Sequence, residues 1–285
     1  MMSNVKGSLY IVATPIGHLA DISLRAIDVL KNVDLIAAED TRNSKKLLNE
    51  YSIQTKMTAY HEHNEDKKSA TLLEKLSDGS SIALISDAGT PLINDPGYSL
   101  VQKAHAMDIK VVPIPGACAL ITALSSSGLA TARFSFEGFL PRTSSARRTA
   151  LEVYLKDSKT LVFYESSHRI TATLEDIQVV FEPTRKMAIA RELTKTFETI
   201  VSGSVVDVVG QAQADKNMQR GEFVVLVEGV QKKGNKSAEL SDASISTLKV
   251  LLQECSLKTA VKLAVELTGE PKKALYSLAL TLTGK

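Results

Sequence analysis

Short apolar runs alternate with stretches of helical periodicity from the start of the chain to residue 230. Strand-like runs separated by helix-like segments are typical of α/β proteins, in which helices cover the faces of a sheet. Asp21 is the expected cap of the first helix. In the first part of the chain the pattern predicts strands at 9–13, 33–38, 82–86 and 110–114, and helices at 21–30, 66–76, 98–107 and 117–127.

The alternation resumes after a break near residues 115–130. Residues 141–148 (PRTSSARR) are polar and basic, and we expect them to form a loop. We therefore predict two α/β domains, at 1–118 and 119–230. The second part predicts strands at 134–139, 160–164, 186–190, 199–202 and 223–228, and helices at 150–155 and 170–180.

The end of the chain has a different composition. Residues 231–239 (QKKGNKSAE) are charged and contain Gly and Ser, as a linker does. Residues 240–285 predict three short helices, which begin at Ser241 or Asp242, at Ser256 and at Pro271. This tail resembles a helix-turn-helix nucleic-acid module, but a packing or dimer-contact role is an equally good interpretation. Its basic face lacks a base-reading pattern and carries Lys258, Lys262, Lys272 and Lys273.

The composition limits the possible classes of protein. The chain is 44% hydrophobic and 23% charged, so we expect a globular protein without long disordered segments. Its net charge of +2 does not indicate a general nucleic-acid binder, so any basic surface must be local. Two cysteines and five scattered histidines predict no metal site, and His61 and His63 are expected in a solvated loop. We see no signal peptide and no membrane span, which predicts a soluble, cytoplasmic protein.

Three turns rich in Gly and Pro follow predicted strands, at 13–17, 86–97 and 113–116. In open α/β sheets ligands bind beyond the carboxyl ends of strands, where such turns gather, although ordinary strand–helix turns would look similar. The chain contains neither GxGxxG after its first strand nor GxxxxGK[ST]. A ligand without phosphates, held largely by the backbone, therefore fits better than a dinucleotide or a nucleoside triphosphate.

Charged clusters also follow predicted strands: 39–42 (EDTR), 164–169 (YESSHR) and 191–195 (RELTK). Each has a structural interpretation as well, because Asp40 or Thr41 could cap a helix and His168 could cap or pack. Several such clusters at strand ends indicate a polar cleft.

Seven motifs occur in order: EDTR, SDAGTP (86–91), DPG (95–97), PG (115–116), GFLP (138–141), YESSHR and ELTK (192–195). Together they resemble the ribosomal small-subunit methyltransferase I family, a branch of the tetrapyrrole methylase superfamily, over residues 7–285. The resemblance implies a homodimer of two α/β domains with S-adenosylmethionine in the cleft between them. It also implies 2′-O-methylation of a cytidine in the decoding region of 16S rRNA, on the assembled 30S subunit.

The resemblance implies a set of donor-binding residues: Pro15, Gly17, Asp87, Ala88, Gly89, Thr90, Ile93, Asp95, Gly116, Cys118, Ala119, Tyr164 and Thr194. A ribose hydroxyl is a poor nucleophile, so a base or a positive field should assist it. From residue type and placement, Asp40 and Glu165 are candidate bases, and Arg42, Arg169 and Lys195 could hold phosphate or stabilise an alkoxide.

Arg142, Arg147 and Arg148, in the predicted loop, and the tail lysines are candidate RNA phosphate contacts, with a solvated surface as the alternative. Two other functions stay open. A tetrapyrrole C-methyltransferase would share the fold and donor, and a non-catalytic ribosome-assembly factor would use the cleft only structurally. Binding of a porphyrinogen would favour the first, and measurable donor binding would weaken the second.

Overall fold

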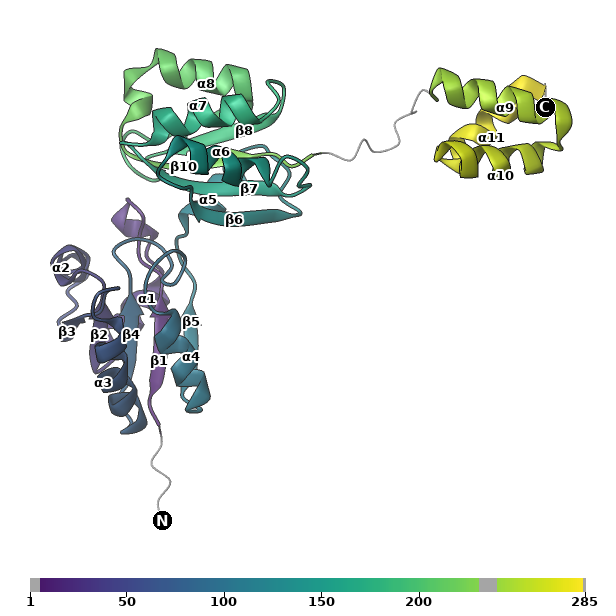
Figure 1. Cartoon of the computed structure of the whole chain (residues 1–285). Coiled ribbons are helices and arrows are strands. Elements are labelled where there is room, and N and C mark those ends of the chain that lie inside the picture. The colour runs from purple at the N-terminus through teal and green to yellow at the C-terminus, as the bar shows by residue number, and fades with distance from the viewer. Residues whose placement is uncertain (1–5, 231–239, 284–285) are drawn as a thin grey trace. The chain divides into compact units, whose positions relative to one another are not determined.

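The computed structural model describes residues 6–230 and 240–283. The chain divides into two compact units, one ending at Val230 and one following it (Figure 1). The linker predicted at 231–239 lies outside the described residues.

The first unit begins with a five-stranded parallel sheet in the order β3-β2-β4-β1-β5. Its central strands are apolar and buried on both faces, as parallel strands covered by helices are. The strands are β1 (Ser8–Val12), β2 (Leu35–Ala38), β3 (Met57–Ala59), β4 (Ile82–Ile85) and β5 (Lys110–Ile114).

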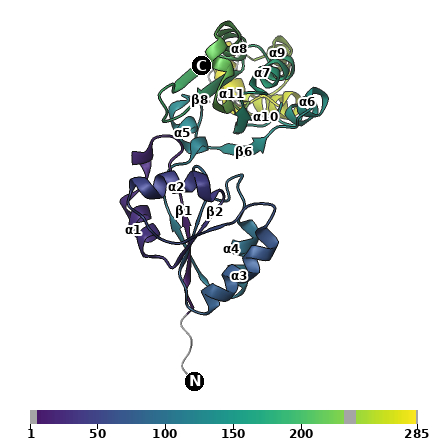
Figure 2. The same ribbon diagram turned by 90° about the vertical axis from the view of Figure 1, so that its left-hand side faces the viewer.

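Helices cover the two faces of this sheet, as Figure 2 shows. Helices α1 (Leu24–Asn32) and α2 (Thr41–Glu50) pack with Val12, Ile36 and Ile85 on one face. Helices α3 (Glu65–Ser77) and α4 (Tyr98–Ala106) pack with Leu9, Ile82 and Leu84 on the other. The carboxyl ends of the strands, with their turns, are therefore left as the edge open to a ligand.

A second, mixed sheet follows in the order β6-β7-β10-β8-β9, with only β6 and β7 parallel. The helices α6 (Ser144–Glu152), α7 (Ile170–Val180) and α8 (Val205–Ala214) cover one face, and α5 (Ala119–Ser126) packs on the other. A short 3-10 helix, η2 (Lys216–Gln219), follows α8, and another, η1 (Leu19–Asp21), follows β1. The strands are β6 (Phe134–Phe139), β7 (Thr160–Ser166), β8 (Lys186–Arg191), β9 (Thr199–Ser204) and β10 (Glu222–Val227).

The second unit is a set of three helices, α9 (Asp242–Glu254), α10 (Leu257–Thr268) and α11 (Lys272–Thr283). Ser241 and Ser256 accept hydrogen bonds from the first turns of α9 and α10, and Gly269 ends α10 with a left-handed φ of +71°. The three helices close around one small core, which contains Leu248, Ala260, Val261, Ala264, Leu275 and Ala279.

The predicted α/β fold with a helical tail is confirmed, but two local predictions were wrong and three elements were missed. Ser23, rather than Asp21, caps α1, because Asp21 lies in η1. The predicted loop at 141–148 is mostly the helix α6, because the hydrophobic spacing continues into Leu151, which is fully buried. The helices α2 and α8 and the strand β3 were not predicted.

Candidate functional site

A cavity of about 320 Å³ in the first unit is lined by turns from the first sheet and by strands of the second. This volume lies at the lower end of the range that small-molecule sites occupy. Its walls are mostly apolar, with polar backbone at the turns. The residues around it are Ile16, Ala88, Gly89, Thr90, Ile93, Asn94, Asp95, Cys118, Ala119, Phe139, Tyr164, Glu165, Ser166, Ala190, Leu193, Glu222, Phe223 and Val224.

The turn after β4 forms one wall. Gly89 has a φ of +85°, and Leu92 and Asn94 have φ values of +71° and +69°. Left-handed backbone is costly for residues other than glycine, and such strain collects at ligand sites where the surrounding structure enforces it. Gly89 exchanges backbone hydrogen bonds with Thr14 at 2.8 and 3.0 Å. The backbone of this wall is thus held in place before any ligand binds.

The opposite wall comes from the second sheet, where Tyr164 is the central side chain. Its hydroxyl accepts a hydrogen bond from the backbone N–H of Leu120 at 3.3 Å, which joins β7 to the first turn of α5. Phe136 packs edge-to-face on its ring, with the centroids 4.7 Å apart. Burial is the main cause that raises the pKa of Tyr164, so this hydroxyl stays protonated and acts as a fixed polar group.

Asp95 is the carboxylate that the cavity wall leaves without a cationic partner among the described ion pairs. Burial, with a contribution from the nearby charges of Glu39 and Asp87, raises its pKa to about 6, against a lowering hydrogen bond from Ser86. An acid with a pKa near the working pH can be ionised by a positively charged ligand. The wall therefore offers a counter-charge for a cation.

Most of the predicted donor-binding residues surround this cavity. Ala88, Gly89, Thr90, Ile93, Asp95, Cys118, Ala119 and Tyr164 line it. The other predicted donor residues do not line the cavity, although each is within two residues in sequence of one that does: Pro15, Gly17, Asp87, Gly116 and Thr194. Among these, Gly17 lies against Thr194, and Gly116 lies against Ala13 so closely that a Cβ would come within 2.8 Å of it.

Several lining residues were not predicted, among them Ile16, Phe139, Ala190, Leu193 and Phe223. They are apolar residues, and although Ile16, Phe139 and Leu193 lie within quoted motifs, an apolar side chain does not by itself indicate contact with a ligand. Their position beside a ligand depends on the way in which the second sheet packs, and local sequence does not record that.

Asp40 and Arg42 are engaged with each other at the start of α2. The Asp40 carboxylate caps the helix by accepting from the Arg42 N–H at 2.8 Å, and the guanidinium bonds it at 2.7 and 3.1 Å. The side-chain hydrogen bond from Arg42 is the main cause that lowers the pKa of Asp40 to about 2. The interpretation of Asp40 as a helix cap is confirmed, and its low pKa makes it a weak base.

Glu165 was predicted as a base, and the structure gives it a different role. Its carboxylate is buried and accepts from Thr173 Oγ1 at 2.7 Å and from the Ser166 N–H at 2.8 Å. Arg169 completes this arrangement, with its Nε 3.4 Å from the carboxylate and its Nη2 bonded to the carbonyls of Leu140 and Pro141. Both side chains are therefore engaged with other groups of the chain, while Glu165 also borders the cavity.

Lys195 lies in the turn after β8 and is paired with two carboxylates. Its Nζ is 3.0 Å from Glu192 and 2.7 Å from Glu222, which lines the cavity. Burial lowers the pKa of Lys195, but the bonds to Glu222 and Glu192 outweigh this effect and raise the pKa. Its positive charge is therefore permanent and largely neutralised by its neighbours.

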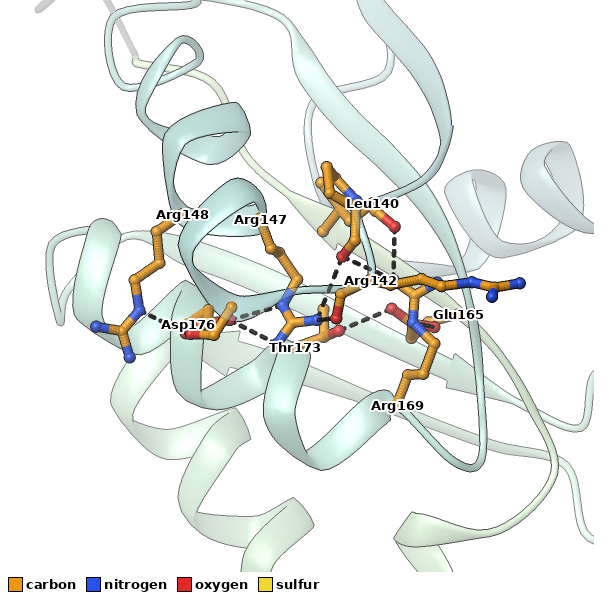
Figure 3. Close-up of polar contacts among 10 residues, drawn as sticks. Leu140, Arg142, Arg147, Arg148, Glu165, Arg169, Thr173 and Asp176 are labelled. Carbon is orange, nitrogen blue, oxygen red and sulfur yellow. Dashed lines mark hydrogen bonds and ion pairs between the residues drawn. The ribbon is translucent and has the colours of Figure 1, made fainter.

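The three arginines predicted to contact RNA separate into different environments (Figure 3). Arg142 is exposed. Arg147 is only 3% exposed and is bonded to the buried carboxylate of Asp176 at 2.6 Å, so its prediction as a phosphate contact was wrong. Arg148 bonds Asp176 from the other side, at 2.5 Å, with its side chain 44% exposed. Arg147 is buried because it lies on the face of α6 that packs against α7.

The tail lysines Lys258, Lys262, Lys272 and Lys273 are all exposed on the second unit. Within residues 6–230 and 240–283, no helix has the length and apolarity that a membrane crossing needs. The same residues contain no group of three or more His, Cys, Asp or Glu side chains placed to hold a metal ion.

Comparison with known proteins identifies the family. Residues 8–209 match the family model for Tetrapyrrole (Corrin/Porphyrin) Methylases, and residues 238–283 match that for the RsmI C-terminal HTH domain. The chain is 50% identical over 279 residues to the Ribosomal RNA small subunit methyltransferase I of Haemophilus influenzae, covering 98% of each chain. It is 48% identical to that of Pseudomonas aeruginosa, covering 98% of this chain and 99% of the relative.

Solved structures show the same fold at low sequence identity. Diphthine synthase has a TM-score of 0.60 at 14% identity, covering 78% of this chain and 90% of that one. Uroporphyrin-III C-methyl transferase from Thermus thermophilus, solved with S-adenyl homocysteine, has a TM-score of 0.54 at 16% identity, covering 77% and 97%. With this fold, these motifs and these full-length relatives, the chain belongs to the ribosomal RNA small subunit methyltransferase I family of the tetrapyrrole methylases.

Proposed function

We propose that this methyltransferase uses S-adenosylmethionine to methylate the 2′-hydroxyl of a cytidine ribose in the decoding region of 16S rRNA, on the assembled 30S subunit. The observation that carries the proposal is the 50% identity to a curated ribosomal RNA small subunit methyltransferase I over 98% of both chains. The cavity between the two sheets supplies the site that such a reaction requires.

The residues around the cavity fit this donor. Apolar walls at Ile93, Ala119 and Leu193 suit an adenosine, and the fixed backbone near Gly89 suits its polar edges. Asp95 provides a negative charge for a donor that carries a positively charged sulfur. The same fold binds S-adenyl homocysteine in the uroporphyrin-III C-methyl transferase from Thermus thermophilus. In this proposal, residues 1–118 and 119–230 act as two domains that enclose the donor.

When bound, the donor supplies a methyl group on an already activated sulfur. The chain then has to align the ribose hydroxyl with that methyl group and to exclude water. Glu165 and Asp40 are each committed to other partners, so we infer that alignment contributes more here than a strong base. Lys195, Glu192 and Glu222 hold the turn that carries Thr194, and this ion-paired group maintains the edge of the site.

We infer that the substrate is held through its shape and its phosphates. Arg142, the outer face of Arg148 and the exposed tail lysines are the proposed phosphate contacts. The protein is proposed to act in the cytoplasm as a homodimer, in which one protomer can hold RNA while its partner supports the site.

The test is methyl transfer from radiolabelled S-adenosylmethionine to purified 30S subunits, naked 16S rRNA and a tetrapyrrole precursor. Subunits from cells that lack this protein are the acceptor, and subunits from cells that contain it are the matched control, because these are already methylated. We expect label on one ribose 2′-oxygen of the first and none on the second. Label on the tetrapyrrole alone would contradict the RNA substrate, and tight donor binding without any transfer would favour a non-catalytic role.

A further inference from the structure

Phe139, at the end of β6, lines the cavity although its side chain is 47% exposed. Its ring meets that of Tyr164 edge-to-face, with the centroids 6.0 Å apart. Aromatic side chains usually bury most of their large apolar surface. The uncovered part of this ring is therefore an apolar platform where the cavity opens to solvent.

A bulge in β6 directs Phe139 toward the cavity. The register of β6 against β7 shifts between Phe136 and Phe139, and Gly138 in between has a φ of +65°. Bulges are common beside active sites, where they redirect the following side chain. A side chain at Gly138 would be strained at this φ and would place a Cβ 3.0 Å from Oδ1 of Asn94, another residue of the cavity. The bulge and the left-handed backbone of Gly138 thus orient Phe139 toward the cavity.

The turn that follows Phe139 is held from below by two arginines (Figure 3). Arg169 donates to the carbonyls of residues 140 and 141 at 2.5 and 3.1 Å, and Arg147 donates to those of 141 and 142 at 3.4 and 3.3 Å. Buried carboxylates hold the two arginines in turn, Glu165 for Arg169 and Asp176 for Arg147. Such buried pairs are costly to form and are more useful for fixing geometry than for stability. The backbone of residues 140–142 is therefore held in a fixed conformation.

Arg142 extends from this turn into solvent. Its side chain is exposed, and among the described residues it forms no ion pair and donates no side-chain hydrogen bond. Figure 3 shows its guanidinium extending away from the clamped carbonyls. A free, exposed guanidinium three residues along the chain from an exposed aromatic ring matches the two parts of a nucleotide, its phosphate and its base.

We propose that Phe139 and Arg142 form the subsite for the acceptor nucleotide, with the unstacked base on the Phe139 ring and a neighbouring phosphate on Arg142. This inference rests on the proposed function. A ribose within folded RNA reaches an enclosed site only when its nucleotide leaves the stack, and an aromatic platform compensates the lost stacking. With 5% aromatic residues and no tryptophan, the chain has few other rings that could do this.

The test compares Phe139→Ala with Phe134→Ala. Phe134 begins the same strand and is 40% exposed, but it does not line the cavity, so it is a matched control. We expect Phe139→Ala to raise the KM for 30S subunits roughly fivefold or more, the effect expected for loss of one stacked base. Phe139→Tyr and Phe134→Ala should leave it nearly unchanged, and Arg142→Gln should raise the KM and weaken its salt dependence. Donor Kd, measured by calorimetry, should change much less than the KM for 30S subunits in every variant, although Phe139 lines the cavity.

A second readout uses the absence of tryptophan from the chain. Phe139→Trp introduces a single indole at the subsite, and Phe134→Trp places one on the same strand outside it. Addition of 30S subunits from cells that lack this protein should quench the first and leave the second unchanged, after subtraction of the subunits' own fluorescence, because stacking on a base quenches indole fluorescence.

Three results would overturn the subsite. Unchanged KM and no quenching would exclude Phe139 as a platform. A loss of donor affinity as large as the loss of transfer would make Phe139 a wall for the donor's adenine instead. If the unaltered protein transfers no methyl group to any RNA, both the proposed function and this inference are wrong. If it transfers normally and Phe139→Ala has no effect on KM, only the subsite is wrong.

Discussion

The backbone N–H of His18 donates to Oγ1 of Thr194 at 3.1 Å, across 176 residues of chain. The bond joins the turn after β1 to the turn after β8, beside the cavity that the two sheets share. Thr194 has a left-handed φ of +63° and Glu192 one of +50°. The turn after β8 thus has a strained backbone where it contacts the turn after β1. The two turns lie so close together that a Cβ at Gly17 would collide with Thr194 and Lys195.

Gly17→Ala tests this contact. The added Cβ would lie 2.6 Å from Cγ of Lys195 and 2.7 Å from Oγ1 of Thr194, and Lys195 cannot move freely because two carboxylates hold it. We expect the free energy of unfolding to fall by about 1–3 kcal/mol, as overpacking usually costs, with weaker donor binding. Urea denaturation measures the change. Gly210→Ala is the control, because α8 leaves open space around Gly210; equal losses in the two variants would contradict the contact.

Asp95 should make donor binding depend on pH. Its pKa is raised to about 6, mainly by burial, so the carboxylate loses its charge as the pH falls through 6. The proposed donor is cationic, and its Kd in calorimetry should therefore rise between pH 7.5 and pH 5. Asp95→Asn should flatten this dependence and weaken binding at pH 7.5 by roughly fivefold, equivalent to about 1 kcal/mol. An unchanged pH profile in the variant would remove Asp95 from the donor site.

The same carboxylate should influence stability with the opposite pH trend. Because the folded-state pKa of Asp95 lies above its ordinary value of 3.8, the folded protein binds its proton more tightly than the unfolded chain does. The cost of the buried charge is absent below pH 4 and develops as the pH rises from 4 to 6. In urea denaturation, Asp95→Asn should therefore gain stability relative to the unaltered protein over this interval. A stability difference between the two proteins that stays constant from pH 4 to pH 6 would contradict the buried charge of Asp95.

Asp176 should be far more important for stability than its partner Arg148. Asp176→Ala leaves the buried guanidinium of Arg147 without its counter-charge, which should cost about 3–5 kcal/mol. Arg148→Gln removes a half-exposed partner of the same carboxylate, and the expected loss is below about 1 kcal/mol. Urea denaturation at pH 7 separates the two. The double change Arg147→Met with Asp176→Leu should recover much of the loss, and similar losses in both single variants would contradict the burial of Arg147.

The lysines of the second unit should contribute to substrate affinity and not to donor affinity. Replacement of Lys258, Lys262, Lys272 and Lys273 by alanine should weaken binding to 30S subunits and lower the salt slope by about one for each phosphate that is no longer neutralised. Filter binding across a salt series measures both quantities. A variant with alanine at four exposed lysines of the first unit, Lys31, Lys75, Lys103 and Lys156, is the control. Equal effects would indicate general charge rather than a specific role of the tail.

Local patterns were sufficient for most of the strands and helices. The strands β5 and β6 and the helix α7 have the predicted bounds, because an apolar run or a helical period between turn residues is a local signal. The same reasoning missed α8, whose four valines favour a strand in isolation. Ser204 caps it as a helix, and three of the valines, Val205, Val208 and Val209, pack with α7 and the second sheet, so the surrounding structure overrides the propensity.

The turns around the cavity were also predictable, because Gly and Pro are enriched where the backbone bends sharply after a strand. Which way the neighbouring side chains face was not. Strand β7 is apolar on both faces, so its sequence has no alternation to show that Tyr164 points into the cavity while Glu165 points to Thr173. Arg147 and Arg142 likewise look equivalent in PRTSSARR. Only the packing of α6 on α7 buries the first and leaves the second in solvent, because burial depends on contacts between segments that are distant in the chain.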